Sequence, residues 1–558
     1  MVKYVLVSDT TLTASYRHFP LLSFLPCAPS SKIPKSVYKF LKGPQVGALE
    51  NGEIKAAPYA LRKVEAALLK ENKREDVVVA HPDYLDRFIK EDTEVIGVTT
   101  MDPLGIGPTT MSYYALFGGT LDAWVTRDWI ELINKINALR KGKKAKLLVG
   151  GPGVWEFTIL RDEVEKEGID YLYQGEADDI IPELFREVAE GSIDENLFFK
   201  GYFSYDEKMR RYYKKDEKFL SKGLMQRTYP RLEEIPAIVR PSMEGLVEVM
   251  RGCGIGCDFC EVTLRPLRYY PFETIKKEVL VNVSMGGYSN AWVHSDEIFG
   301  YMHGPNFVPN EEALVDLFSG LMSIPGVKRS NPTHGRISIP AGYPELIEKL
   351  SKVLRAGPGN WIGIQTGIET GSERLAKIHM PNKTLPLRIG PDGSWMEIVW
   401  QGVYVETKNF WRPAFTVQVG QSEETPEDNW DTIALINQLS NSYAGNIPFE
   451  FTVTPLLNVP LGMLRARKID NTILRDDQIA VYYAAYRHLA KMARRDAFKD
   501  AKGNPMLKYS VGSIIALGGD LMLRIIANIA RKRGVDLEKV KEWGLKGKKE
   551  ITSVQMVE

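Results

Sequence analysis

Three of the four cysteines in the chain lie within one short stretch, MRGCGIGCDFC, at residues 250–260. Cys253, Cys257 and Cys260 follow the spacing C-x3-C-x2-C, and the glycines between them allow a tightly wrapped loop. Three thiolates at this spacing suit a small iron–sulfur cluster. A zinc ribbon needs a second pair of ligands at ribbon spacing, and none follows. A different iron–sulfur or zinc site stays open as the alternative.

The remaining cysteine, Cys27, stands alone in LPCAPSS, and we predict a structural thiol there. Four cysteines in 558 residues do not make a disulfide framework, which favours a reducing, cytoplasmic setting. Three thiolates leave one iron of a four-iron cluster free to bind another molecule. Because no further cysteine is present, we expect no auxiliary cluster.

Composition places the chain among soluble globular proteins of two to four domains, with 44% hydrophobic and 26% charged residues. Lysine plus arginine (72) nearly balances aspartate plus glutamate (71), so no global charge favours nucleic acid as a partner. The apolar start of the chain ends at Asp9, which argues against a signal peptide.

Strands and helices alternate through residues 1–195, which predicts a doubly wound, Rossmann-like parallel sheet. Residues 9–57 are irregular and rich in proline and aromatics, and we expect them to cover another part of the protein. Ligands bind such sheets at the carboxyl ends of the strands. The predicted strands are residues 3–7, 76–80, 95–99, 146–149 and 171–173.

Glycine-lined turns follow three of these strands, and such turns let backbone N–H groups approach an anionic or amide-bearing ligand. Taken singly, each turn is better interpreted as a plain connection between strand and helix. The candidate ligand-binding residues are Thr100, Asp102, Gly105, Gly150, Gly151, Gly153, Gly175 and Glu176.

A second strand–helix series begins at residues 246–250 and predicts a partial (β/α)6 barrel over 246–455, after a connector at 196–245 that holds a β-hairpin. Polar residues gather where the strands end, as in barrel enzymes. The other predicted strands are 290–294, 335–339, 361–366, 413–419 and 449–454.

Residues 456–558 predict a mainly helical C-terminal domain with a very apolar helix over 509–532. Asp520 and Arg524 within that helix argue against a membrane span. Two interpretations remain, a helix buried against the barrel, or an amphipathic surface that touches a membrane or a lipid substrate, with residues 531–533 at its basic edge.

The cysteine loop, with Phe259 just before its last cysteine, resembles the cluster loop of the radical S-adenosylmethionine (SAM) superfamily. The resemblance implies a [4Fe-4S] cluster whose open iron binds SAM, and an electron donor such as ferredoxin or flavodoxin. The electron cleaves SAM to a 5′-deoxyadenosyl radical. The residues that resemble SAM contacts of the superfamily are Phe259, Asp296, Glu297, Arg336, Ser338, Gln365, Gly367, Glu369 and Gln418. The loop GQSEET departs from a frequent GLPGET, and no catalytic side chain is identified.

Residues 1–195 resemble the cobalamin-binding domain of the B12-dependent branch of that superfamily. The chain lacks D-x-H-x-x-G, so no histidine is offered to cobalt. The domain order resembles archaeal ring synthases that form cyclopentane rings in tetraether (GDGT) lipids, our first hypothesis. The alternative is a cobalamin-dependent radical SAM C-methyltransferase acting on a protein or small-molecule carbon. A third hypothesis is a degenerate N-terminal module in a binding or maturation factor. A lipid substrate would add peripheral contact with a membrane.

Overall fold

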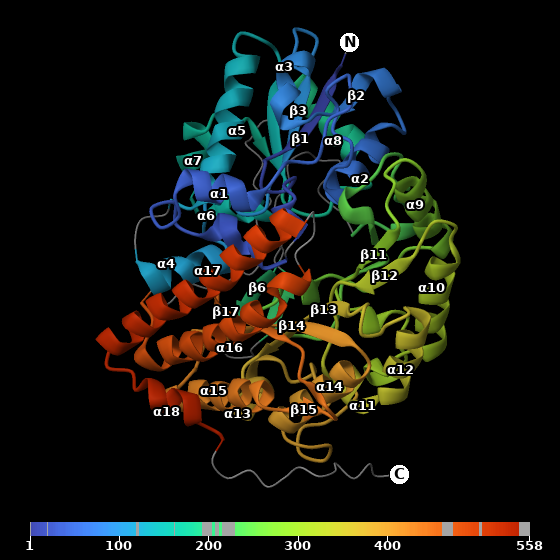
Figure 1. Ribbon diagram of the computed structural model, residues 1–558. Coiled ribbons are helices and arrows are strands. Elements are labelled where there is room, and N and C mark those ends of the chain that lie inside the picture. The colour runs from blue at the N-terminus through green and yellow to red at the C-terminus, as the bar shows by residue number, and fades with distance from the viewer. Residues whose placement is uncertain are drawn as a thin grey trace. The chain divides into compact units, whose positions relative to one another are not determined.

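The structure is a computed structural model whose described residues form two compact units (Figure 1). The first unit comprises the described residues of Met1–Gly335 with Lys352–Arg355 and Val459, and the second those of Arg336–Ser351, Ala356–Asn458 and Ile473–Glu558. The described residues are 2–18, 20–118, 122–160, 162–191, 203–206, 211–214, 229–459, 473–500 and 505–545.

The first unit begins with a five-stranded, fully parallel sheet in the order β2-β1-β3-β4-β5. Runs such as YVLVS and VIGVT are buried along their whole length, as expected of strands covered on both faces. This confirms the predicted doubly wound sheet, with its topological switch point between β1 and β3. The strands are β1 (Tyr4–Ser8), β2 (Val77–Val79), β3 (Val95–Thr99), β4 (Lys146–Gly150) and β5 (Tyr171–Leu172).

Helices cover both faces of this sheet and make two apolar cores. One core takes its helical side chains from α2 and α8, and the other takes them mainly from α5, α6 and α7. The helices are α2 (Tyr59–Leu68), α3 (Leu85–Phe88), α4 (Pro108–Phe117), α5 (Trp124–Arg140), α6 (Trp155–Ile159), α7 (Asp162–Lys166) and α8 (Ile181–Glu190).

The N-terminal extension packs on this domain, as the sequence predicts. Its helix α1 (Lys35–Lys42) stacks Tyr38 on Trp124 of α5, with ring centroids 4.5 Å apart. Lys42 Nζ lies 2.6 Å from Asp128 Oδ2. Burial raises the pKa of Cys27 to about 12, which makes it an unreactive thiol. The extension is thus an ordered part of the domain.

A three-stranded parallel sheet in the order β12-β11-β8 follows in the same unit, with β8 (Leu246–Glu248), β11 (Asn290–His294) and β12 (Arg329–Pro332). The predicted strand at 335–339 is wrong. The place beside β11 is taken by RSNP, whose low β-propensity hid it. Ser338 instead begins the short helix α11 (Ser338–Gly342).

The second unit holds the other three-stranded parallel sheet, in the order β13-β14-β17. Burial alternates along all three strands, so one face is covered and the other is partly exposed. The sixth predicted strand lies slightly later than expected. The strands are β13 (Ile362–Glu369), β14 (Trp411–Val419) and β17 (Thr452–Leu457), so three of the predicted barrel strands lie in this sheet and two, at 246–250 and 290–294, lie in the sheet of the first unit.

The C-terminal part is helical, as predicted, with α16 (Asp476–Asp500), α17 (Pro505–Lys532) and α18 (Leu537–Glu542). The predicted hairpin of the connector is formed by β6 (Phe203–Asp206) and β7 (Arg211–Lys214). The remaining named elements of the barrel sequence are β9 (Met250–Arg251), β10 (Arg268–Tyr269), α9 (Phe272–Ser284), α10 (Glu311–Ser323), α12 (Pro344–Val353), α13 (Glu373–His379), α14 (Trp395–Lys408), α15 (Pro426–Ser440), β15 (Tyr443–Ala444) and β16 (Ile447–Pro448).

One carboxyl group in the core of the second unit predicts a pH-dependent stability. Glu406 on α14 is 1% exposed, neither carboxylate oxygen has a hydrogen-bond partner, and burial raises its pKa to about 8. The folded state therefore keeps a proton that the unfolded state has lost above pH ~4.3. Stability should fall between about pH 4.5 and pH 8, by up to ~1.4 kcal/mol per pH unit from this group.

We expect Glu406→Gln to flatten that pH dependence and to raise the melting temperature at pH 8. Unfolding curves of the variant and the parent chain at several pH values measure the difference. Glu345 is an exposed glutamate on α12, and Glu345→Gln controls for the loss of a carboxyl group. This variant should show the same change of stability with pH as the parent chain. Parallel pH profiles for Glu406→Gln and the parent would contradict the assignment.

Candidate functional site

The cysteine loop leaves the first strand of the barrel sequence and is closed at its base by a short ladder. After β8, strand β9 pairs antiparallel with β10, so both ends of the loop at residues 252–267 are held together. Gly252 N donates to Asp296 Oδ2 at 2.6 Å, and Gly256 N donates to Thr263 Oγ1 at 2.5 Å. The loop that carries the cysteines is therefore tied to the end of β11.

The glycines of this loop are required by its backbone. Gly252, Gly254 and Gly256 all have positive φ, at 81°, 69° and 88°. A Cβ atom on Gly252 would lie 2.5 Å from the carbonyl oxygen of Pro266, so an alanine there would clash with the backbone. The sequence prediction of a tightly wrapped loop is confirmed.

The thiols of the loop are largely shielded from water. Cys257 is buried, while Cys253 and Cys260 are partly exposed. Burial, and next the neighbouring Cys260, raises the pKa of Cys253 to about 12. A bound metal ion deprotonates such thiols, and its positive charge offsets the free-energy cost of a buried thiolate. Among the described residues no three His, Cys, Asp or Glu side chains converge on a single ion, and the cluster assignment rests on the spacing and on the loop.

A buried network of charges joins the cysteine loop to the N-terminal sheet. Arg251, directly before the loop, is 8% exposed. Its guanidinium lies 2.9 Å from Glu248, 2.8 Å from Glu176 and 2.7 Å from Asp178. Its Nη2 also donates to the Tyr270 hydroxyl at 3.1 Å. Because Glu176 and Asp178 follow β5, this network links the edge of one sheet to the loop of the other.

The charge of Arg251 controls the protonation of its partners. Burial alone raises the pKa values of Asp178 and Glu248, but the attraction and hydrogen bonds of Arg251 outweigh it and lower both. Arg268 Nη2 holds the second oxygen of Glu176 at 2.8 Å. Glu176, a predicted cobalamin residue, therefore has both oxygens engaged by arginines.

A second buried pair joins the N-terminal domain to the barrel sequence away from the cysteines. Lys63 Nζ of α2 lies 2.5 Å from Glu278 Oε1 of α9, and the Tyr59 hydroxyl donates to Glu278 Oε2 at 2.8 Å. Like the Arg251 network, this pair connects charges that are far apart in the chain. A variant that breaks this pair can therefore serve as a control for a variant of Arg251.

Several of the predicted cobalamin residues are used by the turns themselves. Asp102 accepts hydrogen bonds from Gly107 N, at 2.9 Å, and from the Thr110 hydroxyl. A Cβ on Gly151 would lie 2.5 Å from Thr99 Oγ1, and one on Gly153 would lie 2.6 Å from the Met101 carbonyl oxygen. A Cβ on Gly105 would likewise meet the Thr126 hydroxyl at 2.7 Å. These glycines allow two loops to pack closely.

Other atoms at the same edge have no protein partner and fit a ligand better. The hydroxyls of Ser8, at the end of β1, and Thr100, after β3, are buried without a hydrogen-bond partner. They lie on either side of the topological switch point, where ligands bind such sheets. A Cβ on Gly150 would have the Tyr173 carbonyl oxygen as its nearest neighbour, 3.7 Å away, and Gly175 adopts φ 126°. Thr100, Gly150 and Gly175 are among the residues predicted from the sequence, whereas Ser8 is not.

The predicted SAM residues of the first unit lie around the cysteine loop. Asp296 holds Gly252, as described above, and Glu297 Oε1 accepts from Phe299 N at 3.1 Å. Phe259 is half-buried within the loop. The Ser295 hydroxyl, which the sequence did not single out, is buried without a partner at the end of β11. This edge keeps one free polar atom for a ligand.

The predicted SAM residues of the second unit gather at the ends of β13 and β14. Glu369 binds Lys383 Nζ at 2.8 Å and accepts from Gln418 Nε2 at 2.9 Å. A Cβ on Gly367 would lie 1.8 Å from Glu369 Oε1, so the glycine makes room for this carboxylate. Lys383 was missed because it lies outside any strand. Gln365 is exposed on the face of β13 that carries Gly367.

The two predicted residues before β13 are placed differently from the expectation. Because residues 335–339 form no strand, Arg336 and Ser338 do not lie on one. Ser338 Oγ donates to the carbonyl oxygens of Lys383 and Leu385, at 3.2 and 3.3 Å, and Arg336 is 3% exposed. In the altered GQSEET loop, Glu424 Oε2 accepts from Gly420 N at 2.7 Å. That carboxylate closes the turn.

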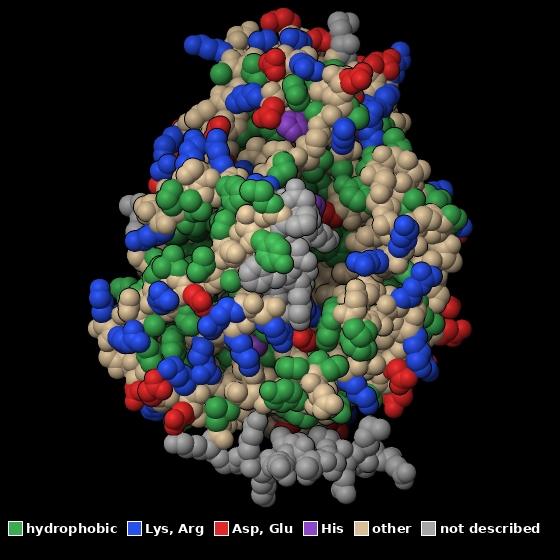
Figure 2. All heavy atoms as spheres, viewed as in Figure 1, with side chains coloured by type: hydrophobic (Ala, Val, Ile, Leu, Met, Phe, Trp, Pro, Cys, Tyr) green, Lys and Arg blue, Asp and Glu red, His purple; other side chains and the backbone are tan. Residues whose placement is uncertain are grey.

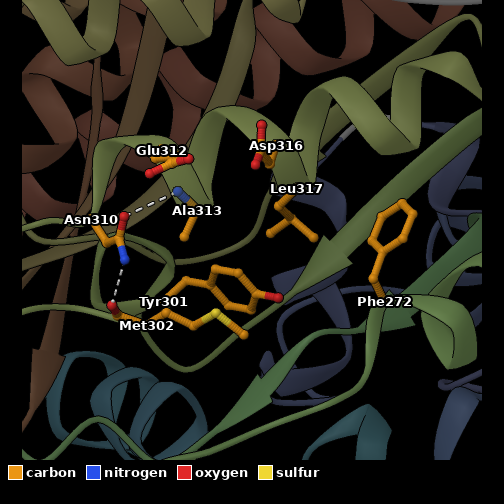
Figure 3. Close-up of a pocket in the computed structure, with 8 residues that line it drawn as sticks. All are labelled: Phe272, Tyr301, Met302, Asn310, Glu312, Ala313, Asp316 and Leu317. Carbon is orange, nitrogen blue, oxygen red and sulfur yellow. Dashed lines mark hydrogen bonds between the residues drawn. The ribbon is translucent and has the colours of Figure 1, made fainter.

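A separate pocket of about 390 Å³ lies between α9 and α10 (Figure 3). Figure 3 shows Asn310 fixing its rim by a bond from its amide to the Met302 carbonyl and another from Ala313 N. None of the predicted site residues lines it. Its lining residues are Phe272, Tyr301, Met302, Asn310, Glu312, Ala313, Asp316 and Leu317.

Comparison with known proteins yields no matching family model and no matching curated protein. Among solved structures, the chain is similar to TsrM from Kitasatospora setae, a radical S-adenosylmethionine methyltransferase. The structure with cobalamin and a [4Fe-4S] cluster matches with a TM-score of 0.47 and 14% identity, over 82% of this chain and 75% of that one. The structure with tryptophan and aza-SAM gives a TM-score of 0.48 and 14% identity, over 83% and 75%. At this identity, the proposal that follows is carried by this chain's own residues.

Proposed function

We propose that this protein is a radical SAM enzyme. The observation that carries the proposal is the C-x3-C-x2-C loop, closed by the β9–β10 ladder and tied by Asp296 at the carboxyl ends of parallel strands. Cys253, Cys257 and Cys260 would hold a [4Fe-4S] cluster with one iron open to SAM. On receiving one electron, bound SAM supplies methionine and a 5′-deoxyadenosyl radical, which removes hydrogen from a carbon that no side-chain base could ionise.

The chain's own residues supply position and shielding in this proposal. Asp296 and Arg251 hold the N-terminal end of the cluster loop. Polar side chains at the strand ends, among them that of Ser295, are available to orient SAM. The protein must also hold the target carbon close to the radical and exclude water from it. The electron would come from a donor such as ferredoxin or flavodoxin.

We further propose methyl transfer as the reaction, with cobalamin at the edge of the N-terminal sheet. The buried hydroxyls of Ser8 and Thr100, with Gly150 and Gly175, would contact the corrinoid. The contact between the loop after β5 and Arg251 supports this, because it places that edge of the sheet beside the cysteine loop. A corrinoid held there would supply the methyl group to the substrate radical. A second electron from the donor and a second SAM would restore that methyl group, with S-adenosylhomocysteine released.

Ring formation in tetraether lipids is the second candidate. One observation favours it, the exposed apolar face of α17, which suits an enzyme that works at a lipid surface. In that reaction the substrate radical forms a carbon–carbon bond within the substrate, and no methyl group is transferred.

Anaerobic reconstitution with iron, sulfide and hydroxocobalamin tests these proposals. We expect about four iron and four sulfide per chain, 5′-deoxyadenosine after addition of dithionite and SAM, and one corrinoid per chain. S-adenosylhomocysteine would support methyl transfer. A chain without corrinoid that forms 5′-deoxyadenosine only with tetraether lipid would support ring formation. A chain that binds no iron would overturn the radical SAM assignment and favour a binding or maturation factor.

A further inference from the structure

The outer face of α17 is a row of large apolar side chains exposed to solvent. Met506 is 81% exposed, Tyr509 65%, Leu517 68%, Leu521 59% and Ile525 39%. These positions recur at helical spacing, so they lie along one side of the helix over about 28 Å. Figure 2 shows hydrophobic side chains gathered over the region where Figure 1 draws α17. An exposed apolar row of this length is typical of an interaction surface.

The opposite side of α17 is fixed against α16. A Cβ on Gly519 would lie 3.3 Å from Ala493 Cβ, so the two helices approach closely. Ile526 and Ala530 are fully buried, and Asp520 Oδ1 lies 3.5 Å from Arg494 Nε. The inner face of α17 is therefore covered by α16, and the outer face is the one that remains exposed.

The composition of this helix points to lipid. The segment Gly512–Lys532 is long and apolar enough to cross a membrane, with a mean hydropathy of 1.6, yet it is only 22% buried. That burial is too low for the core helix of a soluble protein. Crossing a bilayer is disfavoured as well, because α16 packs along one side of the helix and Asp520 is ion-paired there. A helix that lies in the surface of a bilayer can be largely unburied by protein and still keep α16 packed along one side.

The charges beside the apolar row specify the kind of lipid. Arg524, Arg531 and Lys532 are exposed at the C-terminal end of α17. By helical spacing, they continue the side that carries Leu517 and Leu521. Asp520 is the single acidic residue between 512 and 532, and Arg494 neutralises it. An apolar row that ends in basic side chains complements anionic lipid headgroups.

We propose that α17 docks this face on an anionic lipid surface, with the helix lying in the plane of the membrane. The apolar row enters the boundary between headgroups and acyl chains, and the basic end contacts the headgroups. This inference does not depend on the cluster or on SAM, because it rests on α17 and α16 alone.

Sedimentation of the full chain with vesicles tests the proposal. We expect binding to phosphatidylcholine vesicles that contain phosphatidylglycerol, and much weaker binding to phosphatidylcholine alone or at high salt. The double variant Leu517→Gln/Leu521→Gln should bind at least ten-fold more weakly, because two exposed apolar side chains no longer enter the lipid. Arg531→Gln/Lys532→Gln should lose most of the preference for anionic vesicles, at about five-fold per residue.

Met285→Gln serves as the matched control, since Met285 is 60% exposed on a different element. It should bind vesicles as the parent chain does, and circular dichroism should show that all variants are folded. Equal binding by the Leu517/Leu521 variant would overturn the proposal. So would a parent chain that ignores vesicles but forms a dimer that this variant dissociates, because a second copy would then cover the face.

Discussion

Replacing Cys253, Cys257 or Cys260 by alanine is expected to abolish iron binding and SAM cleavage altogether. With three thiolates available, the loss of one leaves too few ligands for a four-iron cluster. The loop itself should survive, because its ends are held by the β9–β10 ladder and by Asp296 rather than by the thiols. Iron analysis, the electron paramagnetic resonance (EPR) spectrum of the reduced protein and 5′-deoxyadenosine formation measure the loss.

Cys27→Ala is the matched control for these variants. Cys27 is partly exposed and lies in the N-terminal extension, outside the cysteine loop, and we expect its variant to bind the full amount of iron. Full turnover in any of the three loop variants would overturn the cluster assignment, and with it the proposed radical chemistry. Loss of iron in Cys27→Ala would show that a cysteine outside the loop is a ligand.

Replacing Arg251 by methionine is expected to have the second largest effect. Removing one partner of a buried ionic network leaves the others uncompensated, which costs about 3–5 kcal/mol of folding free energy. Here Glu248, Glu176 and Asp178 would all lose their main partner. In the parent chain, the lowered pKa values of Asp178 and Glu248 stabilise the fold at neutral pH, and this contribution disappears as the pH falls below about 4.

We also expect Arg251→Met to alter the cluster, because the residue directly precedes the cysteine loop. The EPR signal should broaden or shift, and Arg251→Lys should restore it in part. Lys63→Met breaks a comparable buried pair, with Glu278, at a distance from the cysteines. It should lower stability without changing the signal. If the two methionine variants had the same spectrum, Arg251 would have a role in stability alone.

Local patterns were sufficient for most of the secondary structure. The strands β1, β3, β4 and β11 lie where hydrophobic periodicity places them, because each is a short run of β-branched and other apolar residues between polar turns. The prediction failed at residues 335–339, where GRISI has the alternation of a strand but RSNP occupies the position beside β11. The strand beside β11 is determined by hydrogen-bond pairing with β11, and a local sequence pattern contains no information about such pairing.

For the helix α17, the sequence left two interpretations open, a buried helix and an amphipathic surface. Its hydrophobicity is plain from the sequence, and a helix buried against the barrel was one interpretation. The structure leaves its outer face exposed. Hydrophobicity measures how strongly a side chain favours burial, whereas its exposure depends on whether another element of the fold packs against it.

The sequence by itself determined the cysteine loop and its predicted cluster ligands, because the spacing along a few residues sets the reach of the thiols. It also determined the parallel N-terminal sheet, whose strands are recognised one at a time. Tertiary structure alone decided that Glu176 pairs with Arg251, 75 residues away, and that Lys383 joins Glu369 and Gln418. A charged side chain pairs with whichever opposite charge the fold places beside it. These partners are distant in sequence, so the pairing is set only when the tertiary structure forms.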